Sequence, residues 1–241
     1  METCRIADLL EPFIERSLVR AQLDQISTYI DLLLCWNARI NLTAIREEEE
    51  IVTRHFGESL FLARHLFPTP CHPERSQAES EANGLPESKD PYTLSNPPRV
   101  LDIGSGAGFP ALPVKIWASN IQLTLIESNH KKAAFLREVA RALALTNINV
   151  ITARAETLAA RVGQDFPQAE VVTLRAVENF ETILRQAVSF MAPHGNLALL
   201  IGESQFPHLN AMTAVEWRHP IHIPKSHSRV LSIGRHEQSG T

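Results

Sequence analysis

The sequence has few cysteines and no long apolar run, and each shortage excludes a class of protein. Its three cysteines (Cys4, Cys35 and Cys71) match no metal-binding or disulfide framework. No apolar run approaches the roughly 18 residues that are needed to cross a bilayer. The first residues mix acids with apolar side chains, unlike a secretory signal. We therefore expect a cytoplasmic protein that makes no membrane contact and works in a reducing compartment.

The sequence also lacks a strong excess of charge of either sign. Lys and Arg number 23 against 27 Asp and Glu, which gives a net charge of −4. This balance argues against a generic polyanion-binding protein, but it allows a local basic face on an RNA-modifying enzyme. The hydrophobic share of 44% is ordinary for a globular enzyme. The length of 241 residues allows one sizeable α/β domain and a smaller appendage.

Three parts follow one another along the chain. In residues 1–67, apolar side chains recur at three- and four-residue spacings, which predicts an N-terminal helical segment. Residues 68–98 are rich in Pro, Ser, Glu and Asn and hold almost no apolar side chains. Such a composition buries too little surface to offset the entropy of ordering, so it predicts a flexible linker or insertion. Residues 99–241 form the third part, a predicted catalytic domain.

Strands and helices alternate in this third part. Such alternation predicts an α/β fold with a parallel sheet, helices on both faces and ligands at the carboxyl ends of the strands. The expected strands cover residues 100–103, 123–128, 148–153, 171–176 and 197–202, with a final pair at 221–224 and 229–234. The expected helices cover residues 111–118, 131–145, 155–162 and 180–191.

The stretch "VLDIGSGAGFPALP", residues 100–113, carries the clearest functional signal. A short β-branched run ends in Asp102, and Gly104, Gly106 and Gly108 follow within six residues. Glycine tolerates positive φ and has no Cβ, so the turn can be tight and a ligand can approach its backbone. Strand, glycine turn and helix together present backbone N–H groups to a cofactor. A glycine cluster alone is also compatible with a purely structural turn.

Acidic residues at three successive strand ends favour one cofactor over another. Glu127 ends the second expected strand, where a carboxylate can bind both hydroxyls of a ribose. Nicotinamide cofactors and S-adenosylmethionine both use such an acid. The spacing G-x-G-x-G lacks the extra residue of the dinucleotide fingerprint, and Asp102 would repel a pyrophosphate but suits a sulfonium or ammonium cation. Ala155 and Glu156 follow the third strand, where they can read an adenine edge. Although each acid alone could be a solvated side chain, together they predict a methyltransferase.

Six motifs occur in an order that resembles a known family. They are "WNARINLT", "RHFGESL", "LDIGSGAGFPALP", "LTLIESNHKKAAFLREV", "ARAETL" and "VVTLRAV", and they cover most of residues 18–202. The chain resembles the glucose-inhibited division protein B family, the bacterial 16S ribosomal RNA (guanine-N7) methyltransferases. The resemblance implies a Rossmann-like seven-stranded methyltransferase fold behind an N-terminal helical segment. Members usually have Asp where Glu58 and Glu127 stand here.

The resemblance also implies the site residues and the reaction. S-adenosylmethionine is the expected cofactor, and the partner is 16S ribosomal RNA or the small ribosomal subunit, with the target guanine in a decoding-region hairpin loop. The expected cofactor-binding residues are Asp102, Gly104, Gly106, Phe109, Glu127, Ala155, Glu156 and Arg175. No catalytic base is expected, because guanine N7 has an in-plane lone pair and no proton to remove. Arg175 is a permanent cation that can orient the cofactor or the guanine, or form an ion pair with an acid such as Glu156 or Glu178.

Basic residues outside the glycine turn are candidate RNA contacts. These are Arg39, Arg54, His55, Lys131, Lys132 and Arg229, which suit phosphate binding but are also compatible with ordinary surface charge. Two other functions stay open from the sequence. One is a small-molecule methyltransferase, and the other is an RNA-binding module that keeps the fold without turnover.

Overall fold

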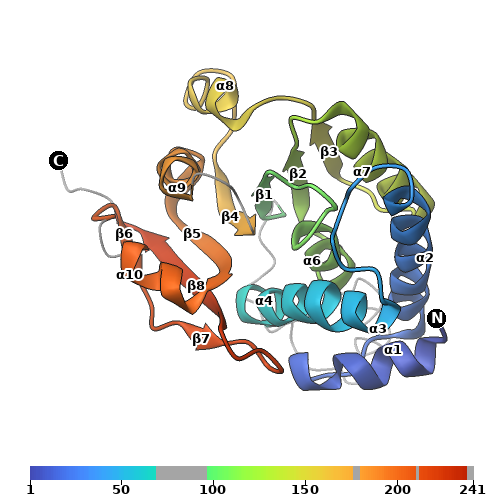
Figure 1. Ribbon diagram of the computed structural model, residues 1–241. Helices are drawn as coiled ribbons and strands as arrows, with labels where there is room; N and C mark the ends of the chain where they lie inside the picture. Colours follow the sequence, from blue (N-terminus) through green and yellow to red (C-terminus); the bar gives the residue numbers. More distant parts are fainter. Residues whose placement is uncertain (69–96, 176–179, 210–211, 238–241) are drawn as a thin grey trace, which may run out of the picture.

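The computed structural model describes residues 1–68, 97–175, 180–209 and 212–237, and its centre is one mixed sheet (Figure 1). The strand order is β3-β2-β1-β4-β5-β8-β6, and β7 also pairs with β8. The strands are β1 (Arg99–Ile103), β2 (Gln122–Ile126), β3 (Ile148–Ile151), β4 (Ala169–Arg175), β5 (Met191–Gly202), β6 (Val215–Trp217), β7 (Ile221–His222) and β8 (Arg229–His236). Strands β1 to β5 are parallel, whereas β6, β7 and β8 pair in antiparallel fashion. The predicted alternating fold is confirmed, with β6 as an additional strand.

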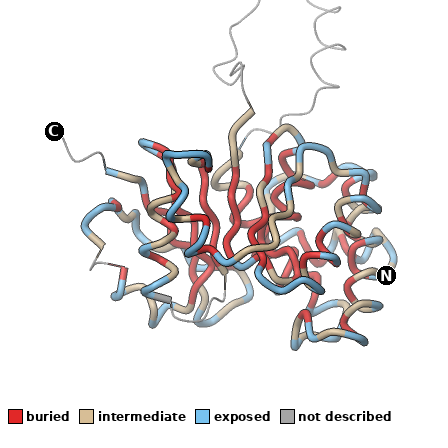
Figure 2. Tube along the Cα trace, turned by 90° about the horizontal axis from the view of Figure 1, so that it is seen from above, coloured by how far each residue is buried: buried red, intermediate tan, exposed pale blue. Residues whose placement is uncertain are grey.

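Helices cover both faces of the sheet. The first face carries the N-terminal helices together with α6 and α7, and the second face carries α8, α9 and α10. Figure 2 shows the buried residues at the centre of the molecule and the exposed residues around its outside. The helices are α1 (Thr3–Leu10), η1 (Glu11–Phe13), α2 (Arg20–Asn37), α3 (Glu48–Glu50), the π-helix η2 (Ile51–Gly57), α4 (Glu58–Leu66), α6 (Ala111–Trp117), α7 (His130–Ala142), α8 (Ala155–Ala159), α9 (Phe180–Ser189), η3 (Glu203–Gln205) and α10 (Phe206–Leu209). None of the described helices is long and apolar enough to cross a membrane.

The N-terminal helices pack directly on the catalytic half of the chain. Helix α2 buries Ile26, Ile30 and Leu33 in the same hydrophobic cluster as the first face of the sheet. Its Gln22 side chain donates to the Ile116 carbonyl at 2.7 Å, and Gln25 donates to the Leu143 carbonyl at 3.0 Å. Both amides therefore satisfy carbonyls at the ends of α6 and α7, which have no partner within their own helices. The predicted linker, residues 68–98, lies almost entirely outside the described residues.

Strand β5 begins earlier than the sequence pattern predicts. We expect the preceding helix to reach Met191 and a turn at residues 193–195, but α9 ends at Ser189 and β5 begins at Met191. The pairing with β4 shifts between Ala169 and Val171, and the extra residues of β5 bulge there. His194 has a φ of +60° in this bulge. Because of this bulge, β5 stays paired on both sides of an irregular stretch. The composition Pro-His-Gly is typical of a turn, so the sequence does not indicate that the strand continues through it.

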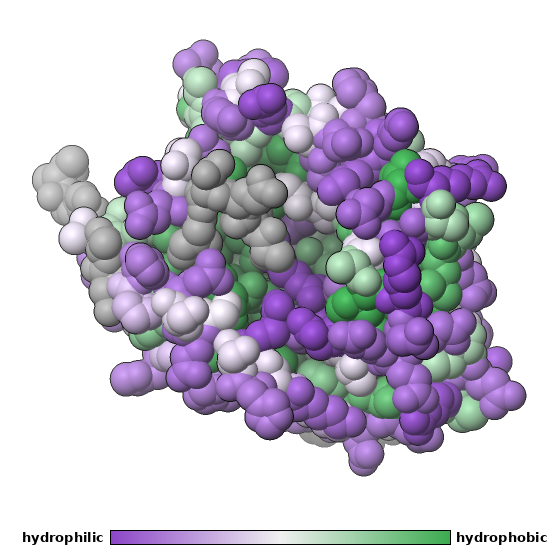
Figure 3. Space-filling model, in the orientation of Figure 1, coloured by the Kyte–Doolittle hydropathy of each residue, from purple (hydrophilic) through white to green (hydrophobic). Residues whose placement is uncertain are grey.

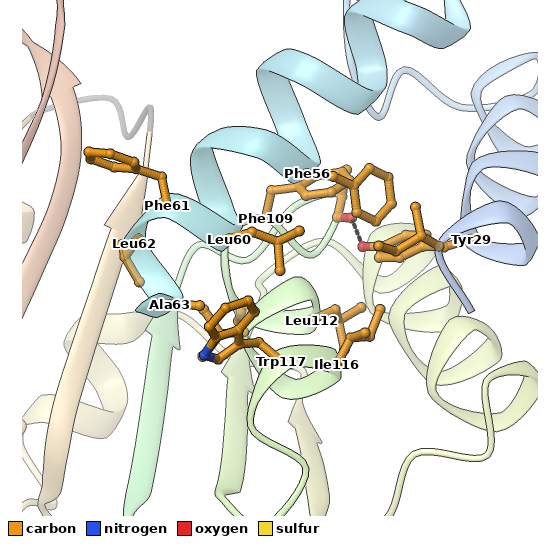
Figure 4. Packing of buried hydrophobic residues seen from close by; sticks show 14 of the residues in the cluster. Tyr29, Phe56, Leu60, Phe61, Leu62, Ala63, Phe109, Leu112, Ile116 and Trp117 are labelled. Carbon is orange, nitrogen blue, oxygen red and sulfur yellow. Dashed lines mark hydrogen bonds between the residues drawn. The ribbon is translucent and has the colours of Figure 1, made fainter. Parts of the chain in front are cut away.

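Tyr29 joins the N-terminal helices to the glycine turn. It is fully buried, and its hydroxyl donates to the Ala107 carbonyl at 2.5 Å (Figure 4). Its ring stacks on Phe109 with a centroid distance of 5.3 Å and an interplanar angle of 4°. Gly108 has a φ of +87°, and a Cβ there would meet the Tyr29 hydroxyl and lie 2.6 Å from Leu112 Cδ1. The absent side chain of Gly108 is therefore what lets Tyr29 approach.

We expect Gly108→Ala to lower the free energy of unfolding by about 2–5 kcal/mol, because it combines left-handed strain with overpacking. Gly163→Ala is the matched control, since Gly163 has a φ of +80° but nothing within 4 Å of its added Cβ. It should lose only about 1–2 kcal/mol. Urea unfolding of both variants measures the difference. An equal loss of unfolding free energy in both variants would show that Tyr29 moves aside without a free-energy cost and does not constrain the turn.

Candidate functional site

The glycine turn follows β1 and is fixed to the neighbouring strand by its backbone. Gly104, Gly106 and Gly108 have φ values of 68°, 54° and 87°, which confirms that glycine serves positive φ at all three positions. The N–H groups of Gly104 and Ser105 donate to the Ile126 carbonyl at 2.9 and 3.0 Å. A Cβ on Gly106 would meet nothing closer than the Gly104 carbonyl oxygen at 3.7 Å. The side of the turn at Gly106 is thus open for a ligand.

Glu127 links the glycine turn to the start of α7. Its carboxylate accepts the Gly106 N–H at 2.8 Å through Oε2 and the Asn129 N–H at 2.7 Å through Oε1. The side chain is buried, and Asn129 in turn caps α7 by accepting from the N–H groups of Lys131 and Lys132. Each carboxylate oxygen has a second lone pair, so Glu127 can also accept ribose hydroxyls.

Asp102 is a buried carboxylate with one oxygen unsatisfied. Its Oδ1 accepts the Thr173 hydroxyl at 2.6 Å, whereas Oδ2 has no hydrogen-bond partner among the described residues. Burial raises the pKa of Asp102 to about 7, and the charge of Glu127 adds to the shift. An unpaired buried carboxylate costs free energy, so this position favours a cation or a hydrogen-bond donor as its partner.

The ring of Phe109, the residue after Gly108, stacks with the rings of Tyr29 and His55. Tyr29 packs on one ring face, and His55 packs with a centroid distance of 4.6 Å and an interplanar angle of 19°. Burial and the charges of nearby arginines lower the pKa of His55 to about 3. His55 is therefore neutral and its Nε2 shares a hydrogen bond of 2.8 Å with the Thr43 hydroxyl. The structure thus corrects the expected cationic phosphate contact at His55, because burial removes its charge.

Three arginines converge on one buried carboxylate, which we call the Glu58 cluster: Glu58, Arg54, Arg175 and Arg229. Glu58 is 2% exposed, and its oxygens lie 3.7 Å from Arg54 Nε, 3.1 Å from Arg175 Nη2 and 3.0 Å from Arg229 Nη2. Burial raises the pKa of Glu58, while the three guanidinium groups oppose this shift. Burial lowers the pKa of Arg175 to about 10, which leaves it a cation at neutral pH.

The Glu58 cluster gives Arg175 an ion partner that the sequence did not suggest. Among the described residues Arg175 pairs with Glu58, whereas Glu156 is exposed and lies 4.0 Å from Arg154; Glu178 lies outside the described residues. Glu58 was not among the predicted site residues. The feature of the sequence that could have indicated it is that Glu58 is a lone acid in the apolar stretch "HFGESLFLARHL", four residues after Arg54.

The remaining predicted residues lie around this centre. Ala155 is buried at the start of α8, next to the exposed Glu156. Arg39 and Lys131 are exposed and Lys132 is half-buried, and no ion pair joins them to the Glu58 cluster within the described ranges. Figure 3 shows a hollow in the face viewed in Figure 1, with hydrophobic atoms inside it and a hydrophilic band along the side formed by α4. No group of acids, histidines and cysteines in the described part of the chain is arranged to hold a metal ion.

Comparison with known proteins identifies the family. The profile of the rRNA small subunit methyltransferase G family matches residues 22–69 and 88–229, a span that includes the glycine turn and the Glu58 cluster. The chain belongs to this family. It is 38% identical to ribosomal RNA small subunit methyltransferase G of Roseiflexus castenholzii, over 73% of this chain and 66% of that protein. It is 34% identical to the protein of the same name from Chloroflexus aggregans, over 88% of this chain and 81% of that protein.

A solved structure outside this methyltransferase G family shows the same fold. The fibrillarin/Nop5p complex matches with a TM-score of 0.50 and 15% sequence identity, over 58% of this chain and 73% of that one. Membership of the methyltransferase G family confirms the predicted enzyme class, and the small-molecule alternative is not favoured.

We expect Glu58→Gln to lower the free energy of unfolding by about 3–5 kcal/mol, because it leaves buried guanidinium groups without a counter-charge. Glu50→Gln is the matched control: Glu50 also pairs with Arg54, at 3.3 Å, but is 46% exposed. Exposed pairs contribute little, so this variant should lose less than about 1 kcal/mol. Denaturant unfolding distinguishes the two. Similar small losses in both variants would contradict the central role of Glu58.

Proposed function

We propose that the chain transfers a methyl group from S-adenosylmethionine to N7 of a guanine in 16S ribosomal RNA. The proposed target lies in the decoding-region hairpin loop, and the proposed partner is 16S ribosomal RNA or the small ribosomal subunit in the cytoplasm. Family membership supports the rRNA substrate. The observation that carries the choice of cofactor is the unsatisfied Oδ2 of buried Asp102, two residues before the first glycine of the turn.

The charges around the turn fit S-adenosylmethionine better than a dinucleotide. Asp102 and Glu127 are both buried acids, and a pyrophosphate between them would be repelled. A cofactor with sulfonium and ammonium groups gives Asp102 the cationic partner that it lacks. In this proposal Glu127 accepts the ribose hydroxyls, Gly104 and Gly106 give backbone access, and Ala155 and Glu156 lie at the adenine end. Bound S-adenosylmethionine supplies an electrophilic methyl group on its sulfonium sulfur.

The surrounding residues position the reactants rather than move protons. Guanine N7 carries an in-plane lone pair and no proton at neutral pH, so its methylation requires no general base. Arg175 is a cation that Glu58 and the Arg54 carbonyl hold through Nη2, at 3.1 and 2.7 Å. His55 is neutral and stacked on Phe109. These groups suit orientation and electrostatic stabilisation, which are sufficient for an in-line methyl transfer.

Labelled methyl from S-adenosylmethionine should therefore appear at one guanine of unmethylated small-subunit rRNA. Borohydride reduction and aniline treatment should then cleave the RNA at that guanine, as N7-methylguanine allows. Gly106→Val should abolish transfer, because its side chain fills the open side of the turn. Label on an exocyclic amine or a ribose would contradict the N7 assignment, and label in metabolites or nowhere would contradict the substrate.

The same assay tests the absence of a general base. At saturating cofactor the single-turnover rate should stay flat from about pH 6 to 9. Saturation is required because the pKa of Asp102, about 7 without a bound cation, lies inside this range. A bound cation favours the carboxylate and so lowers that pKa below the range. A rate that rises tenfold per pH unit would reveal an essential base.

A further inference from the structure

The Glu58 cluster holds more positive charge than it neutralises. Three guanidinium groups surround the Glu58 carboxylate at 3.0, 3.1 and 3.7 Å, and Glu50 also pairs with Arg54 at 3.3 Å, so one positive charge is left over among the described residues. The neighbouring His55 adds no charge, because its pKa is lowered to about 3. An unbalanced charge that is largely buried is costly, so an anion that enters here is stabilised by the remaining positive charge.

Two arginines of the cluster also have one nitrogen each without a hydrogen-bond acceptor among the described residues. Arg175 Nη1 and Arg229 Nε are buried and have no partner among the described residues, and the Arg175 side chain is only 8% exposed. The cluster is open on one side, since the Arg229 and Arg54 side chains keep 21% and 45% of their surface exposed. An oxyanion reached from that side would supply acceptors to a fork of guanidinium donors.

The cluster borders the proposed methyl-transfer site. Arg175 ends β4, and the preceding Leu174 pairs with Ile103 at the end of β1, directly before the glycine turn. The Arg175 Cζ lies 6.0 Å from the centroid of the Phe109 ring. Arg175 therefore lies beside the glycine turn, and its charge acts on that of Asp102.

We propose that Arg229, Arg175 and Arg54 bind a backbone phosphate of the substrate RNA next to the target guanosine, with Glu58 as their fixed counter-ion. This inference rests on the proposed rRNA function. The carboxylate of S-adenosylmethionine is the other possible oxyanion, but it is attached to an ammonium and close to a sulfonium. The cofactor end that carries it is cationic as a whole, and the uncompensated positive charge of the cluster repels it. A phosphodiester carries negative charge alone, so charge favours RNA.

The test compares Arg229→Gln with Arg235→Gln on the same strand. Arg235 is exposed and lies six residues further along β8, roughly 20 Å from Arg229 in an extended strand. Both variants lose one positive charge. We expect Arg229→Gln to raise the Kd for unmethylated small ribosomal subunits about tenfold. It should also lower the slope of log Kd against log salt concentration by about 0.7–0.9, the effect of one lost phosphate contact. Arg235→Gln should keep the wild-type slope.

Two further measurements keep the outcome decisive. Calorimetric titration with S-adenosylmethionine should give the wild-type Kd in Arg229→Gln. Arg229→Lys, which keeps the charge but not the fork, should keep the wild-type salt slope with weaker binding. Equal slopes in Arg229→Gln and Arg235→Gln, or a slope lost equally in Arg229→Lys, would overturn the phosphate site. A tenfold loss of cofactor affinity with unchanged RNA binding would also overturn it and assign the cluster to the cofactor carboxylate.

The result is separable from the proposed reaction. Equilibrium binding requires no methyl transfer, so the salt slopes report on the cluster even if the methylated atom is not N7. Wild-type protein that shows no specific binding to the small subunit in these titrations would overturn both the rRNA substrate and the phosphate site. Specific binding with equal slopes in the two glutamine variants would overturn the phosphate site alone.

Discussion

The carboxylate of Glu58 is the interaction on which the site depends. It holds arginines from three segments that are far apart in the sequence: Arg54 in η2, Arg175 at the end of β4 and Arg229 at the start of β8. Without a buried anion, these guanidinium groups would repel one another at the carboxyl edge of the sheet. The N-terminal helices therefore contribute to the site as well as to the core. They supply Glu58 beside the arginines and Tyr29 behind the glycine turn.

The acidic and the basic side chains of the site lie on different strands of the sheet. The buried acids Asp102 and Glu127 lie at the ends of β1 and β2, where a cationic cofactor fits, and the positive charge gathers at the ends of β4 and β8. Methyl transfer to RNA brings together a cationic donor and a polyanionic acceptor. A site with an acidic region and a separate basic region can bind the cationic donor and the RNA at the same time. His55 stacks on Phe109, and burial together with the charges of nearby arginines keeps it uncharged.

Much of the fold and part of the site follow from local sequence. The order of strands and helices, the positive φ at Gly104, Gly106 and Gly108, and the place of Glu127 at the end of β2 are consequences of patterns within a few residues. The pairing of Arg175 with Glu58 is not, because 117 residues separate them and their meeting depends on how α4 packs against the sheet.

The roles of Tyr29 and Thr173 could not be predicted from local sequence either, because their partners Ala107 and Asp102 are 78 and 71 residues away. The charge of His55 could not be predicted either, because it depends on burial and on three arginines from other segments. Such long-range contacts cannot be predicted from patterns within a few residues.

The central claim about the site is that the buried acids at the ends of β1 and β2 hold a cationic cofactor. Calorimetric titration with S-adenosylmethionine tests this claim most directly, in wild-type protein, Glu127→Ala and Glu170→Ala. Glu170 pairs with Arg99 at the opposite end of the sheet, so its loss removes the same charge away from the site. The account predicts that Glu127→Ala weakens binding by about 1–3 kcal/mol and that Glu170→Ala stays within about twofold of wild type. Wild-type affinity in Glu127→Ala, or an equal loss in both variants, would contradict it.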